Sequence, residues 1–366
     1  MSGNIIGERF VAVSFGESHG KCIGVVVDGC PAGLPISEVD VQSKLDLRKP
    51  GQSIVTTQRK EEDRVEILSG VLNGNTTGAP ICMLIRNKDS DSRPYDQIKN
   101  TPRPGHADYP AMMKYGGFND YRGGGRFSGR ITATFVMAGA IAEKLLRQIL
   151  GIEILAYTLE IGPIRVNNLS ISDVRKLRYS NEVRCPDPAV AERMKEAVVK
   201  AKSDGDSLGG VVECTALNMP IGLGEPVFGA LESDLSKALF AIPAVKGVEF
   251  GSGFEGTKRR GSENNDIYTI ENGKIVTVSN NSGGILGGLS NGMPLLLRIA
   301  FKPASSIAKK QQSVDVQSME QTEMTVPGRH DPCVVPRAPP VVEAIVAIIL
   351  ADHAIKYGLI PPVLKR

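Results

Sequence analysis

The sequence predicts an α+β fold built as a single domain over residues 1–366. Strand-like and helix-like segments follow one another in mixed order, without the strict alternation that marks a doubly wound parallel sheet. Apolar residues make up 41% and charged residues 23% of the chain, as in ordinary globular domains, so a large core can form. No low-complexity linker or short repeat divides the chain.

The elements of the first third are predicted from local pattern. Residues 22–28 (CIGVVVD) are β-branched and stop at a glycine, which indicates a strand. A Pro-Ala-Gly-Leu-Pro turn leads to an expected helix over 36–48, which opens with Ser-Glu. Residues 65–87 are interpreted as two strands around the turn cluster 73–78. By contrast, 89–129 is rich in Gly, Pro, Asp, Tyr and Arg, and we expect an ordered, functional loop without regular structure.

The rest of the chain contains the clearest helix, over 131–150, where apolar residues recur with a helical period. The further expected elements are helices over 187–203, 231–240 and 339–357, strands over 210–217 and 295–301, and a hairpin over 268–278.

Composition excludes several classes of protein. The net charge is +3, aromatics are 5% and Trp is absent, which argues against a nucleic-acid binder. The N-terminal segment has no apolar signal core, and the apolar run 341–351 is too short to span a bilayer. The six cysteines form no C-x-x-C motif, which is typical of reduced thiols. We therefore expect a soluble cytoplasmic protein without membrane or nucleic-acid partners.

Histidines mark the first candidate chemistry. Three of the four, His19, His106 and His330, lie in polar segments bounded by Gly or Pro, whereas His353 falls in the expected C-terminal helix and is interpreted as structural or surface. Loops between regular elements are the usual place for site residues, and histidine transfers protons near neutral pH. Three histidines in such similar settings favour one shared catalytic site.

Two other chemistries are disfavoured. Residues 16–20 spell the G-x-S-x-G motif of serine hydrolases, but a strand, not the long helix of a nucleophile elbow, is expected at 22–28. No H-E-x-x-H or close His/Cys spacing occurs, so no metal site is predicted.

Basic, glycine-rich segments predict anion binding. Residues 122–130 (RGGGRFSGR) place three arginines four apart just before the clearest helix, whose N-terminus adds positive potential. Residues 48–53, 283–288 and 302–306 are further loops of this kind. None has the Walker or G-x-G-x-x-G pattern, so the expected ligand carries several anionic groups and is bound without a standard nucleotide cradle.

Ten sequence blocks, including these loops and the histidine segments, follow one another along nearly the whole chain and resemble the chorismate synthase family. They are GESHG (16–20), VDGCPAGLP (27–35), RKPGQS (48–53), TTQRKEEDRVEILSGV (56–71), RPGHADY (103–109), DYRGGGRFSGR (120–130), AVKGVEFGSGF (244–254), NSGGILGG (281–288), KPASSI (302–307) and GRHDPCVVPRA (328–338).

The resemblance implies a β-α-β sandwich, homotetrameric assembly and reduced FMN as cofactor. It also implies the last common step of the shikimate pathway: anti-1,4-elimination of phosphate and a C6 hydrogen from 5-enolpyruvylshikimate 3-phosphate, giving chorismate. Because there is no net redox change, the flavin would lend electron density and take it back. NADPH is a possible reductant, although no added reductase domain is evident and we favour an external source.

The same resemblance assigns roles to residues. His19 would protonate the departing phosphate, His106 would protonate reduced FMN, and Asp331 would act with flavin N5 as the base on the C6 hydrogen. The flavin contacts it implies are Arg126, Phe127, Ser128, Gly284, Lys302, Pro303, Ala304, Ser305, Ser306 and Arg329. Substrate phosphate and carboxylate groups would be bound by Arg48, Arg103, Arg130 and Arg337, with Arg48 also placed for NADP.

Four positions depart from the family pattern. Leu47 and Ile54 stand where arginine is more common, Phe127 begins Phe-Ser-Gly where Ser-Ser-Ala is usual, and Ala304 replaces a common threonine. We expect these changes to tune ligand binding and not to abolish it.

Two other classes of protein share some of these sequence features. A phosphotransferase acting on a phosphorylated carbocycle would explain the basic loops but not the missing nucleotide motif. A non-catalytic flavin- or RNA-binding module would need neither three histidines in polar loops nor near-neutral net charge. Binding of ATP would distinguish the first of these from the elimination chemistry.

Overall fold

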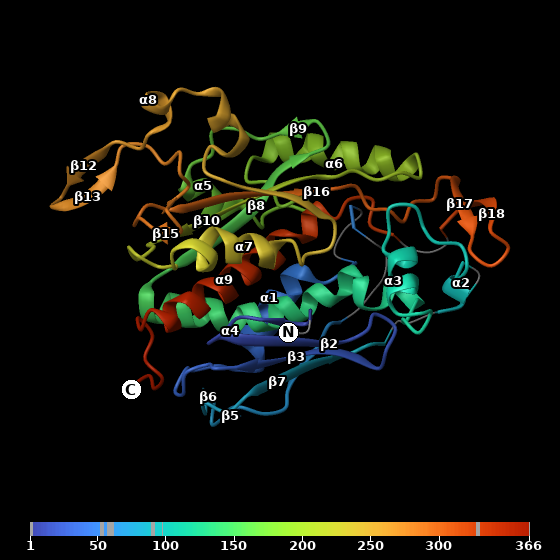
Figure 1. Cartoon of the computed structure of the whole chain (residues 1–366), viewed down its shortest axis with the longest axis horizontal. Helices are drawn as coiled ribbons and strands as arrows, with labels where there is room; N and C mark the ends of the chain where they lie inside the picture. The colour runs from blue at the N-terminus through green and yellow to red at the C-terminus, as the bar shows by residue number, and fades with distance from the viewer. Residues whose placement is uncertain are drawn as a thin grey trace.

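Two five-stranded antiparallel sheets enclose a layer of helices (Figure 1). The computed structural model describes residues 3–51, 55–56, 62–88, 92–96, 98–326 and 330–365. One sheet has the order β1 (Ile5–Ile6), β2 (Val11–Gly16), β3 (Cys22–Asp28), β7 (Ile81–Arg86), β4 (Val65–Ile67). The other has the order β11 (Val245–Phe250), β16 (Leu295–Phe301), β10 (Gly210–Leu217), β8 (Glu153–Ile161), β9 (Ile164–Arg165).

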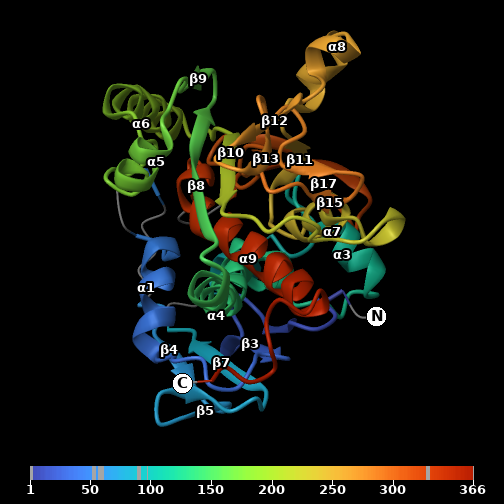
Figure 2. The same cartoon turned by 90° about the vertical axis from the view of Figure 1, so that its left-hand side faces the viewer.

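The helical layer consists mainly of α4 (Thr132–Leu150) and α9 (Pro339–Lys356), which pack against each other between the sheets (Figure 2). Nearly every residue of α9 is buried, as expected of a helix that is apolar all round. α1 (Glu38–Arg48) and α7 (Leu231–Leu239) flank this pair. The structure thus confirms the α+β fold and the β-α-β sandwich.

Smaller elements surround the sandwich. The peripheral helices are α2 (Arg93–Asp96), α3 (Asp108–Lys114), α5 (Ile171–Leu177), the longer α6 (Pro188–Ser203) and α8 (Gly261–Asn264). Hairpins are β5 (Val71–Leu72) with β6 (Asn75–Thr76), β12 (Tyr268–Glu271) with β13 (Lys274–Thr277), β14 (Ile285–Leu286) with β15 (Leu289–Ser290), and β17 (Gln311–Asp315) with β18 (Glu320–Met324). The 3₁₀ segments are η1 (Arg122–Phe127), η2 (Gly129–Ile131), η3 (Val227–Gly229), η4 (Gly253–Lys258) and η5 (Val335–Arg337).

Two local predictions need correction. The segment 89–129 is not without regular structure, because it contains α2, α3 and η1. These helices are too short for an apolar period to be visible in the sequence. Residues 65–87 form four strands rather than two, since the turn cluster closes the small β5–β6 hairpin between β4 and β7.

The C-terminal ends of α1 and β2 place site residues. α1 begins at Glu38, where the Ser37 backbone N–H donates to Asp40 Oδ2 at 2.8 Å, and it ends at Arg48 before Pro50. β2 ends at Gly16 and the chain turns directly into β3, so the 16–20 motif forms a hairpin and not a strand-to-helix elbow. No helix within the described ranges is long and apolar enough to cross a membrane.

Candidate active site

A cavity of about 730 Å³ opens at the end of the sandwich where α4 and α9 begin. Its wall includes Thr132 at the start of α4 and Ala338 and Val341 at the start of α9. The volume lies in the upper part of the roughly 300–1,000 Å³ range of small-molecule sites. Two helix N-termini facing one cavity add positive potential and favour an anionic ligand.

Most of the predicted site residues meet at this cavity. Its wall contains Arg48, Arg103, His106, Arg126, Phe127, Ser128, Arg130, Lys302, Pro303, Ala304, Ser305, Ser306, Asp331 and Arg337, together with His330. His19 lies beside the cavity, Gly284 lies elsewhere in the fold, and Arg329 falls outside the described residues.

His19 and His106 lie on either side of one glycine turn in η1. A Cβ built on Gly123 would be 2.3 Å from His19 Cδ2, and a Cβ on Gly124 would be 3.2 Å from His106 Cε1. Both glycines adopt the left-handed conformation, with φ of 59° and 82°. The run of glycines in the sequence is therefore required both by the turn and by the close approach of the two rings.

The His19 ring is held by polar and aromatic contacts. Its Nδ1 lies 3.0 Å from Ser92 Oγ, and its edge meets the Tyr95 ring at a centroid distance of 5.2 Å. Tyr95 and Gly123, which contact the ring, both line the cavity. The imidazole is thus one layer away from the cavity surface.

His106 belongs to a compact charged cluster before α3. Its Nδ1 lies 2.6 Å from Asp108 Oδ1, and Asp108 also accepts from Arg103 Nε at 2.7 Å. Burial by itself raises the pKa of Asp108, but hydrogen bonds from Arg103 and His106 outweigh it and hold that pKa well below its usual range. The permanent carboxylate fixes the orientation of His106.

Arg103 connects this cluster to the loop that follows β16. Its NH1 group donates to Ser306 Oγ at 3.0 Å, and Lys302 donates to the backbone carbonyl of Gly105. The two predicted anion-binding segments, around His106 and over 302–306, therefore form one continuous wall.

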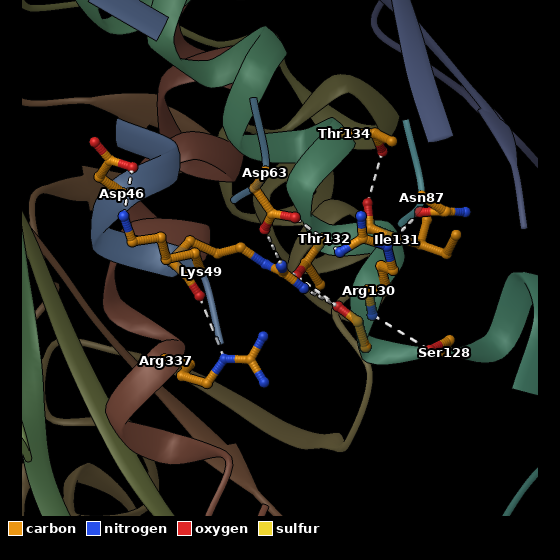
Figure 3. Close-up of polar contacts among 12 residues, drawn as sticks. Asp46, Lys49, Asp63, Asn87, Ser128, Arg130, Ile131, Thr132, Thr134 and Arg337 are labelled. Atoms are coloured by element: carbon orange, nitrogen blue, oxygen red, sulfur yellow. Dashed lines mark hydrogen bonds and ion pairs between the residues drawn. The ribbon is translucent and has the colours of Figure 1, made fainter. Parts of the chain in front are cut away.

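Arg48 and Arg130 share a buried carboxylate, Asp63 (Figure 3). Asp63 Oδ2 accepts from Arg48 at 3.1 Å and Oδ1 accepts from Arg130 at 2.8 Å. Burial raises the pKa of Asp63, but the two arginine charges outweigh it, so the net shift is downward. Burial first, and then the charge of Arg337, lowers the pKa of Arg48 to about 9, so this guanidinium is still charged at neutral pH.

Asp331 pairs with Arg337, whose NH1 group donates to Asp331 Oδ2 at 2.6 Å. The Nε group of Arg337 also donates to the backbone carbonyl of Arg48 at 3.3 Å. The carboxylate predicted as a base is thus fixed at the cavity wall by a neighbour six residues along the chain.

The three residues of the predicted flavin-contact block 126–128 differ in how much of each side chain is already engaged within the protein. Arg126 donates to the Gly16 carbonyl at 2.9 Å and to Asn4 Oδ1 at 2.9 Å, so much of its hydrogen-bonding capacity is used within the protein. Ser128 Oγ accepts from the Arg130 backbone N–H at 3.4 Å and begins η2. Phe127 keeps 41% of its surface exposed.

Gly284 lies at the opposite end of β16 from Lys302. A Cβ on Gly284 would be 2.6 Å from the Pro294 carbonyl oxygen, next to the first residue of β16, whereas Lys302 follows its last residue. A seven-residue strand spans about 20 Å, so one ligand in this chain cannot contact both positions.

Sequence reasoning missed four residues that shape the site. Ser18 lines the cavity, and its buried Oγ makes no hydrogen bond to another described residue. Asn87 accepts from Arg130 Nε at 2.6 Å and donates to the Gly20 carbonyl at 2.8 Å. Asp63 and Asp108 are the buried counter-ions described above. Ser18, Asp63 and Asp108 lie inside the blocks that carried the resemblance and Asn87 lies between two of them, but only their contacts distinguish these residues from their neighbours.

The fold and the cavity together define a class of protein. A helix-filled sandwich of two antiparallel sheets brings arginines, a lysine, two histidines and a carboxylate to one cavity. These side chains can bind an anionic small molecule and transfer protons. This combination is typical of the active site of an enzyme.

Comparison with known proteins identifies the family. The family model for chorismate synthase matches residues 10–355. Relatives named chorismate synthase are 56% identical in Korarchaeum cryptofilum (97% of this chain, 98% of that protein) and 55% identical in Dehalococcoides mccartyi strain BAV1 (99% and 100%). A crystal structure of chorismate synthase is 32% identical with a TM-score of 0.75, covering 96% of this chain and 93% of that one. The chain belongs to the chorismate synthase family and is a carbon–oxygen lyase.

Proposed function

We propose that this chain converts 5-enolpyruvylshikimate 3-phosphate into chorismate by anti-1,4-elimination of the 3-phosphate and a C6 hydrogen. The main support is that the four arginines expected to bind substrate line one cavity together with Lys302, His106 and Asp331. Arginine forks pair with phosphate and carboxylate oxygens, and the substrate carries both groups.

Asp331, His19 and the arginines would have different roles in the elimination. Asp331 would accept the proton from C6 while the C3–O bond to phosphate breaks. His19 would give a proton to the departing phosphate, which the arginines hold. Both charge states of histidine are accessible near neutral pH, and an ionised carboxylate accepts protons.

Reduced FMN would occupy the same cavity, and two observations support the fit. The buried Ser18 hydroxyl faces the cavity without a hydrogen bond to another described residue, which suits a polar ligand group. The 302–306 loop adds a cation and two hydroxyl side chains to the wall. When bound, the flavin would supply transient electron density for the elimination, with no net redox change.

Departures from the family pattern bear on flavin and nicotinamide contact. Phe127 and Ala304 line the cavity without side-chain hydroxyls, whereas Ser128, Ser305 and Ser306 retain theirs. Ile54 lies outside the described residues. We propose that flavin binding is retained through the remaining hydroxyls, and that the reductant is external.

We further propose homotetrameric assembly in the cytoplasm. If Gly284 contacts flavin, as the family resemblance implies, its position at the far end of β16 requires the flavin of another copy. Sedimentation of the purified protein with and without FMN tests this, and a monomer under both conditions contradicts it.

The test of the reaction is anaerobic. The purified protein is mixed with chemically reduced FMN and 5-enolpyruvylshikimate 3-phosphate, and chorismate absorbance and inorganic phosphate are followed together. Equimolar release of both, dependent on reduced flavin, is the expected result. Absence of both products, with substrate and flavin shown to bind, would overturn the proposal.

A further inference from the structure

Asp63 is a fully buried carboxylate that bridges two cavity-lining arginines through separate oxygens. Oδ2 accepts from Arg48 and Oδ1 from Arg130, and the Asp63 side chain has 0% exposure. One carboxylate therefore fixes two guanidinium groups and neutralises one of their two charges. None of the functional roles proposed above uses Asp63.

The backbone around Asp63 is held from α1. The Gln42 side chain donates to the Asp63 carbonyl at 3.3 Å and accepts from the Val65 N–H at 3.0 Å. Asp63 itself has a φ of 47°, a left-handed conformation that is strained for a non-glycine residue. Such conformations persist where surrounding contacts hold them, and they concentrate at functional sites.

The two arginines have further fixed contacts. Arg48 donates from Nε to Thr132 Oγ1 at 3.1 Å and from NH2 to the Gly129 carbonyl at 2.8 Å. Arg130 donates from Nε to Asn87 Oδ1 at 2.6 Å, and Asn87 in turn donates to the Glu17 carbonyl at 3.0 Å. The pair thus connects α1 and the start of α4 to the loop that carries Ser18 and His19.

Removal of the shared carboxylate would leave two like charges together in a buried wall. Loss of one partner from a buried ion pair is strongly destabilising, because the remaining charge is uncompensated. The guanidinium groups would separate, and Arg130 would lose the contact opposite Asn87. The spacing of cations that a ligand meets would change even where the fold survives.

We propose that Asp63 is a positioning residue that sets the spacing and net charge of the Arg48–Arg130 pair, and so its selectivity for a ligand with anionic groups at fixed separation. This inference rests on the proposed function. Inorganic phosphate, a single compact anion, depends on total positive charge and much less on the spacing of the cations. Substrate, which carries phosphate and carboxylate on one ring, depends on both.

The test compares substrate with phosphate in Asp63→Asn. Asparagine keeps the volume but offers one acceptor oxygen, so it can satisfy one arginine and presents an N–H group to the other. We expect KM for substrate to rise about tenfold or more. The inhibition constant of inorganic phosphate stays within about twofold or falls, because the competing carboxylate is gone.

A matched control is Glu62→Gln. It removes one negative charge from the neighbouring residue, which pairs at 2.8 Å with Lys88 in an exposed ion pair. Both constants should stay within about twofold of wild type, as expected for an exposed pair. Turnover by wild type and this control reports the proposed function independently of Asp63. Absence of chorismate from both would overturn that function and this inference with it.

Two results for a folded Asp63→Asn variant would overturn the inference alone: an unchanged substrate KM, or a substrate KM and a phosphate inhibition constant that rise by the same factor. If Asp63→Asn does not fold, the same two constants are measured for Gln42→Ala. It loosens the Asp63 backbone from a half-exposed position outside the cavity wall. We expect substrate KM to rise by about two- to fivefold with the phosphate constant unchanged. An unchanged KM there overturns the inference.

Discussion

The Cα atom of Gly123 lies so close to the His19 imidazole that a methyl group there would be 2.3 Å from Cδ2 and 2.5 Å from Nε2. Real Cβ atoms do not approach other atoms this closely, so any side chain at position 123 must displace the ring or the turn. The turn also contacts His106 through Gly124.

Gly123→Ala should therefore lower turnover by up to about hundredfold, since a shift of about 1 Å in a catalytic group can cost that much. The matched control is Gly116→Ala. Gly116 has the same φ of 59°, but a Cβ there would meet only Phe118, at 3.9 Å. Steady-state kinetics and thermal unfolding separate the effects: both variants pay the backbone cost, and only Gly123→Ala loses activity. Equal loss in both would show that strain alone is responsible.

The Asp108–His106 pair predicts a dependence of stability on pH. Because the folded-state pKa of Asp108 is lowered, its ionised form stabilises the fold above the unfolded carboxyl pKa of about 3.9, and this stabilisation is lost as pH falls towards the folded value. Asp108→Asn should lower Tm by a constant amount from about pH 5 to 8, and the gap to wild type should shrink below about pH 4. Turnover should also fall, because His106 loses its orienting carboxylate. A gap that persists unchanged in acid would contradict the pairing.

The sequence predicted those elements whose period is visible locally. The α4 prediction (131–150) and the strands 22–28, 210–217 and 295–301 are confirmed within a residue or two. β8 was not predicted, because both its faces are covered and its run EILAYTLEI lacks a clear alternation. The short helices within 89–129 were missed for the opposite reason, since each is too brief to show a period.

The site was predicted as residues and not as contacts. The motif resemblance named His106, Asp331 and four substrate-binding arginines as site residues, and the structure places all of them at one cavity. The resemblance could not reveal that Asp331 is paired by Arg337, because side-chain contacts within a block depend on its fold, or that Asp63 lies between Arg48 and Arg130, because these residues come from different blocks. It names both Gly284 and Lys302 as flavin contacts, but it could not reveal that they lie at opposite ends of β16.

Variants at three of the four histidines should separate chemistry from stability. His106→Ala and His19→Ala are expected to lower turnover by about 10²- to 10⁴-fold while the protein stays folded, as for loss of a group that transfers a proton. His353 is buried in α9 and lies 2.9 Å from Asp234, so the structure places it as a structural residue. His353→Gln should lower Tm with kcat retained. Wild-type turnover in the first two variants would remove their catalytic assignment.

Asp331→Asn tests the base directly. Asparagine keeps the shape of the side chain and can still accept a hydrogen bond from Arg337, so the wall should stay in place around the 2.6 Å contact. It cannot take up the C6 proton, and kcat should fall by about 10²-fold or more while flavin affinity, measured by anaerobic titration with reduced FMN, stays within about threefold. With substrate deuterated at C6, the variant should show a larger kinetic isotope effect than wild type, because proton removal becomes the slow step. Joint loss of flavin binding and turnover would instead mean that Asp331 holds the cofactor site together, and the C6 proton would then need another acceptor.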